Sequence, residues 1–135
     1  MSRVHFDPST GLLIVALAGK LNLGRAIANV QEADRLAETH RAFTGVLVDL
    51  RQIYDTDVLS YPEMYRLVRA LAQYPRLAKA PTAVVDVYRK GFEKAQFFES
   101  AASDKGHRVR AFVDYDAATE WLKEMAPAPV RELPR

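Results

Sequence analysis

The segment Gly45-Val46-Leu47-Val48-Asp49-Leu50 decides how this chain is expected to fold. It is short, apolar and rich in β-branched residues, which is typical of a strand buried on both faces of a sheet. A polar loop follows, and then Ser60-Tyr61-Pro62-Glu63, in which Ser at the N-cap and Glu three residues later indicate a capping box. Pro62 is compatible with a helix there because the first turn has no hydrogen bond for it to lose. We therefore predict a strand, a loop and a helix in succession.

The segments on either side repeat this alternation of strands and helices. Before it, strands are predicted at residues 4–6 and 12–17, joined by a turn that ends at Gly11, and a helix is predicted to begin at the N-cap Asn22. After it, we expect Pro75 to end the helix that Ser60 begins. Further strands are predicted at residues 82–87 and 109–113, and further helices at residues 92–105 and from the N-cap Asp114 onward, with Gly106 in a left-handed conformation.

The predicted order is ββαβαβαβα, which is typical of a largely parallel sheet with one antiparallel strand from the opening hairpin. The expected fold class is α/β, with a single-layer, mostly parallel sheet of five strands flanked by four helices. Residues 1–125 are predicted to form one domain. Residues 126–135 include three prolines and are predicted to form a loose tail.

Composition narrows the class of protein but not its mechanism. The chain has 135 residues, of which 49% are hydrophobic and 27% charged, and its net charge is +2, as expected for a single folded domain. It contains no cysteine, which excludes thiol nucleophiles, disulfides and cysteine-ligated metals. The longest apolar run, at residues 12–18, is too short to span a bilayer, so we expect a cytoplasmic protein that does not span the membrane.

Three segments resemble a known family. Leu17-Ala18-Gly19-Lys20-Leu21-Asn22 is similar to the Gly-x-Leu-Asp signature that follows the second strand of STAS domains, the anti-sigma-factor-antagonist type. The run from Val46 to Leu50 is similar to the third strand of that family, which ends in Asp-Leu. Residues 109–122, with Phe112, Asp114 and Trp121-Leu122, resemble the ending of the SpoIIAA-like branch, which is also described as STAS/SEC14-like. The resemblance covers residues 4–125.

The resemblance implies a regulatory domain that acts through protein–protein contact, and its SEC14 aspect implies an apolar or lipid ligand. In phosphorylated members of the family, a serine follows the aspartate of the loop after the third strand. That serine position falls on Val58 here, directly after Asp57, and Thr56 and Ser60 stand out of register. Because Val58 has no hydroxyl, the phosphorylation switch is not expected at this position.

Aromatic residues gather in the loops that follow the predicted strands, at the strand ends where open α/β sheets bind ligands. We predict a partner or ligand surface from the loop 54–60, the start of the next helix and the segment 88–92. Asp57 and Ser60 would hold the shape of the loop, and the aromatic residues would make apolar contacts. The predicted surface consists of Tyr54, Asp55, Thr56, Asp57, Ser60, Tyr61, Tyr88 and Phe92. Of the adjacent Phe97 and Phe98, at least one is expected at an interface or pocket edge, because both cannot face inward on one helix.

We therefore expect a non-enzymatic regulatory or interaction domain without cofactor or metal, which binds a protein partner and has an apolar small molecule or lipid as a candidate ligand. Nucleic acid is not an expected partner, because no nucleic-acid-binding motif is present. Residues 61–110 carry ten basic and five acidic residues, so an acidic partner is one possibility.

Two alternatives remain at this point. One is a small enzyme that uses Asp49 or Asp57 with a histidine or tyrosine, and the other is a ligand-free homodimeric scaffold that buries Phe97. All three histidines, His5, His40 and His107, are predicted to lie on the surface.

Overall fold

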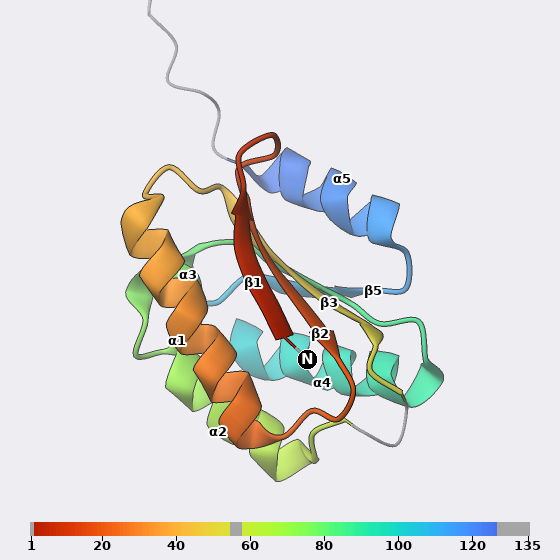
Figure 1. Ribbon diagram of the computed structural model, residues 1–135. Coiled ribbons are helices and arrows are strands. Elements are labelled where there is room, and N and C mark those ends of the chain that lie inside the picture. Colours follow the sequence, from red (N-terminus) through yellow and green to blue (C-terminus); the bar gives the residue numbers. More distant parts are fainter. Residues whose placement is uncertain (1, 55–57, 127–135) are drawn as a thin grey trace, which may run out of the picture.

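The computed structural model, in which residues 2–54 and 58–126 are described, has an α/β fold built on one five-stranded sheet (Figure 1). The strands lie side by side in the order in which they occur along the chain. β1 is antiparallel to β2, and all other neighbours are parallel. The predicted α/β class and mostly parallel five-stranded sheet are therefore confirmed. The strands are β1 (Ser2–Asp7), β2 (Leu12–Ala18), β3 (Gly45–Gln52), β4 (Thr82–Val85) and β5 (Val109–Phe112).

The described residues form five helices rather than the four predicted. The additional helix is short and begins at Pro75, the residue that was expected only to end the preceding helix. Proline favours the first helical position because its fixed φ suits a helix and its missing N–H has no helical partner there. The helices are α1 (Leu23–Thr39), α2 (Tyr61–Leu71), α3 (Pro75–Lys79), α4 (Arg89–Ser103) and α5 (Tyr115–Met125).

The predicted helix starts at Asn22, Ser60 and Asp114 are confirmed by hydrogen bonds. The Asn22 side chain accepts from the Arg25 N–H at 2.8 Å. Ser60 Oγ accepts from the Glu63 N–H at 3.3 Å, while the Glu63 carboxylate accepts from the Ser60 N–H at 2.9 Å, which completes the capping box. The Asp114 side chain accepts from the Asp116 N–H at 3.3 Å. The predicted left-handed conformation of Gly106 is confirmed by its φ of 82°.

The fourth predicted strand and the helix after it differ in their bounds from the prediction. β4 ends at Val85 rather than 87, and α4 begins at Arg89 rather than 92. The reason is Asp86, whose buried Oδ1 accepts a hydrogen bond from the Tyr88 N–H at 3.0 Å and so turns the chain into the helix three residues early. Of the predicted tail, Ala126 is the C-cap of α5, and residues 127–135 lie outside the described part of the chain.

The strand order determines which face each helix covers. Parallel crossovers are almost always right-handed, so strands added one after another in the same direction place their connecting helices on one face. α1, α2, α3 and α4 accordingly pack against one face of the sheet and bury the larger apolar cluster. α5 packs on the opposite face, through a smaller cluster that includes Leu47 and Leu122 (Figure 1).

Candidate functional site

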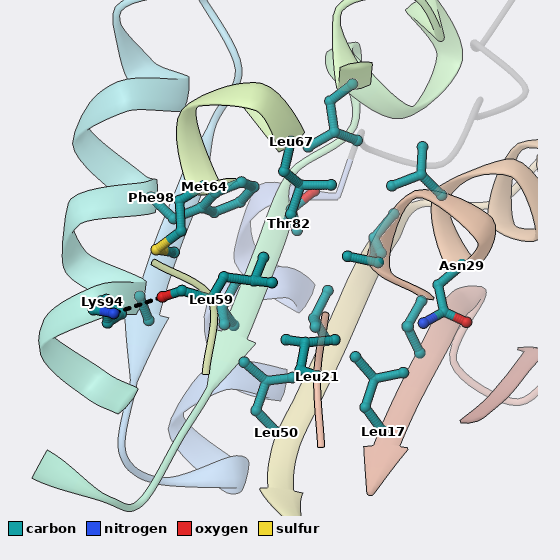
Figure 2. A pocket seen from close by; sticks show the side chains of 18 of the residues that line it. Leu17, Leu21, Asn29, Leu50, Leu59, Met64, Leu67, Thr82, Lys94 and Phe98 are labelled. Carbon is teal, nitrogen blue, oxygen red and sulfur yellow. Dashed lines mark hydrogen bonds between the residues drawn. The ribbon is translucent and has the colours of Figure 1, made fainter. Parts of the chain in front are cut away.

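An apolar cavity of about 120 Å³ lies between the sheet and helices α1, α2, α3 and α4 (Figure 2). Side chains of β2, β3 and β4 form its floor, among them Leu17, Leu50 and Val84. The helices contribute small residues at several positions that face it, including Ala26, Ala33 and Ala95. Protein interiors are otherwise packed to crystal density, so short side chains on facing helices leave a space that larger ones would fill.

The lining is almost entirely apolar. Of the described residues that line the cavity, four have polar side chains: Asn29 from α1, Thr82 from β4, Lys94 from α4 and His107 from the segment before β5. Figure 2 shows Lys94 and Asn29 on opposite sides of the cavity. A mostly apolar space with a few polar groups is the usual composition of a small-molecule site.

Lys94 connects α4 to the chain that enters α2. Its Nζ donates a hydrogen bond to the Leu59 carbonyl at 2.5 Å (Figure 2). The same Nζ lies 4.8 Å from the centroid of the Tyr61 ring. Leu59 is buried and lines the cavity, and so does Val58. Val58 stands where the resembled family has its phosphorylated serine, and here its side chain contributes to an apolar wall instead.

Three of the five predicted surface residues that the structure describes take part in edge-on aromatic contacts. Tyr54, which is 58% exposed, meets Tyr88 edge-on with 5.8 Å between ring centroids. Tyr61 meets Phe97 edge-on at 4.8 Å. Ser60 caps α2, as predicted, and Phe92 is half-buried in the first turn of α4. Asp55, Thr56 and Asp57 lie outside the described residues.

The two adjacent phenylalanines of α4 face different surroundings, as predicted. Phe98 is buried and lines the cavity. Phe97 is half-buried at the seam between α4 and α2, where it contacts both Tyr61 and Tyr65. The two faces of α4 at this point therefore serve different purposes, one enclosing the cavity and one holding α2 in place.

His107 is buried, and its predicted surface location is wrong. Only 5% of the residue is exposed, and its Nε2 lies 2.9 Å from Thr82 Oγ1. The chain turns at Gly106, which has a positive φ, and the imidazole that follows is buried beside Thr82, which is 25 residues away in the chain and so is not revealed by local pattern. Burial lowers the pKa of His107 below its ordinary value, and a hydrogen bond to the Ala80 backbone opposes this shift only in part.

We expect the lowered His107 pKa to make the protein less stable in mildly acidic solution. The unfolded chain binds a proton at pH about 6.5, whereas the folded chain resists it, so protonation favours unfolding. The free energy of unfolding should have its full value above pH 6.5. It should fall as the pH drops towards 5, by at most about 1.4 kcal/mol per pH unit, because one proton is taken up on unfolding. Urea denaturation at half-unit pH steps measures this slope.

The matched variants are His107→Leu, which should remove the slope, and His40→Gln, which should keep it. His40 is half-buried at the end of α1 and stacks on Phe6 of β1. Slopes rather than absolute stabilities are compared, because His107→Leu also loses the contact with Thr82. An unchanged slope in His107→Leu would show that other groups cause the acid sensitivity.

Asp49, the carboxylate considered for catalysis, is held in an ion pair. Arg51 contacts it through two side-chain nitrogens at 2.9 Å each, and the guanidinium lies 4.4 Å from the centroid of the Tyr115 ring. Burial acts to raise the pKa of Asp49, but the hydrogen bonds from Arg51 outweigh it, so the pKa lies below its ordinary value. A carboxylate that must take up a proton near neutral pH needs the opposite shift.

Sequence reasoning did not single out Asn29 or Thr82, and it placed Lys94 only among surface charges. Asn29 did carry a signal, because it lies three residues after Ala26 and four before Ala33, on the face that α1 buries. A polar residue at a buried helix position is uncommon and is a reason to examine it. Lys94 carried no such signal, since its contact with Leu59 spans 35 residues of chain.

Comparisons with known proteins do not assign the chain to a family. No protein-family model, curated protein or solved structure matches it. Among the described helices, none combines the length and apolar character needed to cross a membrane.

Proposed function

We propose that this chain is a STAS-like regulatory domain that binds a small apolar ligand in the cavity. We also propose that it contacts a protein partner through the predicted surface beside the cavity, which includes Tyr54, Tyr61 and Tyr88. The observation that carries the proposal is the cavity itself, which lies between the sheet and four helices and is lined almost wholly by apolar side chains. The resemblance of residues 4–125 to SpoIIAA-like domains supports the regulatory part of the proposal.

The size of the cavity limits the ligand. An engineered cavity of about 150 Å³ in another protein binds benzene and stays free of water. A cavity of about 120 Å³ is therefore suited to a single small ring or to the end of an alkyl chain. The driving force is the removal of apolar ligand surface from water, at roughly 25 cal/mol per Å².

The contacts of Leu59 provide a route from ligand to partner. Leu59 lines the cavity, and its carbonyl is held by Lys94, whose ammonium lies over the Tyr61 ring. Tyr61 is 47% exposed and begins α2. A ligand that displaces the Leu59 side chain would therefore shift the position of Tyr61, which lies on the proposed partner surface. Binding energy that differs between the two positions of this segment would make the partner's affinity depend on the ligand.

We expect benzene to bind in the cavity of the wild-type protein and to lose at least tenfold in affinity when the cavity is filled. Ala33→Leu and Ala95→Leu each place a larger side chain into the space from a different helix. Amide chemical shifts in a two-dimensional NMR titration measure the affinity, and the shifts should be concentrated in α1, α2 and α4. Mass spectrometry of the undenatured protein would detect a ligand retained through purification.

The matched control is Ala117→Leu, the same change at an exposed position of α5 on the opposite face of the sheet. It should leave benzene binding unchanged. If benzene shifts no amides in wild-type protein, or binds equally to all four proteins, the cavity is not a ligand site and the proposal fails.

A further inference from the structure

We infer that the ligand of the cavity is a neutral molecule with a carbonyl or ether oxygen, and that the side-chain amide of Asn29 donates the hydrogen bond that recognises it. The inference rests on the proposed function and adds the chemical class of the ligand. Asn29 lies in the middle of α1, is only 8% exposed and lines the cavity (Figure 2). Its Nδ2 is buried and has no hydrogen-bond partner in the described part of the chain.

The other polar groups of the lining are already paired. Thr82 Oγ1 and His107 Nε2 lie 2.9 Å apart, and Lys94 donates to the Leu59 carbonyl. Buried polar groups in folded proteins nearly always have partners, so an amide left without one is an exception that needs a reason. A ligand that accepts a hydrogen bond from this amide would provide that reason. The unpaired N–H groups destabilise the ligand-free protein, and binding of the ligand would remove this cost.

Water is a poorer partner for this amide than a ligand. A buried water needs two to four polar partners, and the α1 residues that line the cavity beside Asn29 are Ala26, Val30 and Ala33. A carboxylate would also be a poor fit, because burying an ionised group in apolar surroundings costs far more than burying a neutral one. A ketone, aldehyde, ester or ether combines an apolar body with one uncharged acceptor, which matches the lining.

The test compares two probes of nearly identical shape, cyclopentanone and methylenecyclopentane, in which a carbonyl oxygen replaces a methylene group. Their affinities are measured by amide chemical-shift titration for wild-type protein and for Asn29→Leu, which keeps the side-chain volume but removes the amide. We expect the ratio of ketone to alkene affinity to fall about 3- to 10-fold in Asn29→Leu, the range of one hydrogen bond. Ala117→Leu, on the face of the sheet opposite the cavity, serves as the control and should change this ratio less than twofold.

The outcomes separate this inference from the proposed function. If the alkene binds but the ratio is the same in wild-type protein and Asn29→Leu, the cavity is a ligand site and the role of Asn29 is wrong. The role of Asn29 is also wrong if Ala117→Leu lowers the ratio as much as Asn29→Leu does. If neither probe binds to wild-type protein, the proposed function fails, and this inference fails with it.

Discussion

Replacing Gly91 with alanine should destabilise the protein by about 3 kcal/mol, near the upper end of what added volume costs in a packed core. A Cβ atom at Gly91 would lie 2.5 Å from Cγ of Asp86 and closer still to Oδ2. Asp86 is fully buried at the end of β4, and its Oδ1 accepts the Tyr88 N–H that leads into α4. The carboxylate therefore cannot turn aside without losing that bond. The higher helix propensity of alanine, worth about 1 kcal/mol, offsets only part of this cost.

The matched control is Gly24→Ala in the first turn of α1. A Cβ atom there would meet only Asn22 Oδ1, at an ordinary contact distance of 3.5 Å, so the free energy of unfolding should change by less than about 0.5 kcal/mol. Urea denaturation followed by circular dichroism measures both variants. If Gly91→Ala is as stable as Gly24→Ala, then Asp86 does not occupy the position that the structure gives it.

A double variant tests the cause of the Gly91→Ala effect. Asp86→Ala alone loses the hydrogen bond to Tyr88 and should also destabilise the protein. The double variant lacks the carboxylate that the new alanine side chain would meet. Its loss of stability should therefore be smaller than the sum of the losses measured for the two single variants. An additive result would mean that the alanine at position 91 acts through something other than Asp86.

Leu122→Ala should destabilise the protein by about 3 to 4 kcal/mol, within the range for buried leucine truncations. Leu122 is 1% exposed and packs at the start of β3, where its Cδ2 lies 3.1 Å from the position of a Cβ atom built on Gly45. It belongs to the small cluster through which α5 covers its face of the sheet, together with Leu47 and Ala118. α5 is the one described helix on that face, so few neighbours are present to relax into the space.

Leu23→Ala makes the same chemical change at a half-buried position in the first turn of α1, outside both apolar clusters, and should cost less than about 1 kcal/mol. Hydrogen exchange adds a second measurement. Amides of α5 should lose more protection in Leu122→Ala than amides of α1, because the lost packing holds α5 to the sheet. Equal effects of the two truncations on unfolding would contradict the packing described for α5.

Prediction from sequence succeeded where the determinant is local. The three helix N-caps, the turn glycine at position 106 and the positions of the strands all follow from residues within a few positions of each other. It was wrong at the start of α4 and at His107. α4 begins early because the buried carboxylate of Asp86 accepts the Tyr88 N–H, a local contact whose burial the sequence pattern does not show, and His107 is buried beside Thr82, which is 25 residues away in the chain.

For the candidate site, the sequence drew attention to the aromatic loops but not to the cavity, and the role of those loops stays a prediction. Tyr54, Ser60, Tyr61 and Tyr88 stand out because they follow predicted strands, and the structure places Tyr54 against Tyr88. The cavity is lined by residues from four helices and three strands, and no segment of sequence contains more than a fraction of them. Asn29 becomes a candidate recognition group only once the cavity that it lines is known.

The amino-acid sequence by itself therefore determined the elements and the fold class, beginning with the buried strand 45–50 and the capping box that follows it. Hydrophobic periodicity, helix caps and turn residues each involve only a few neighbouring residues, so they can be recognised directly in the sequence. The tertiary structure alone decided the strand order, and the strand order places α1, α2 and α4 on one face. The cavity exists because short side chains of α1 and α4 meet there, and these residues are far apart in the chain.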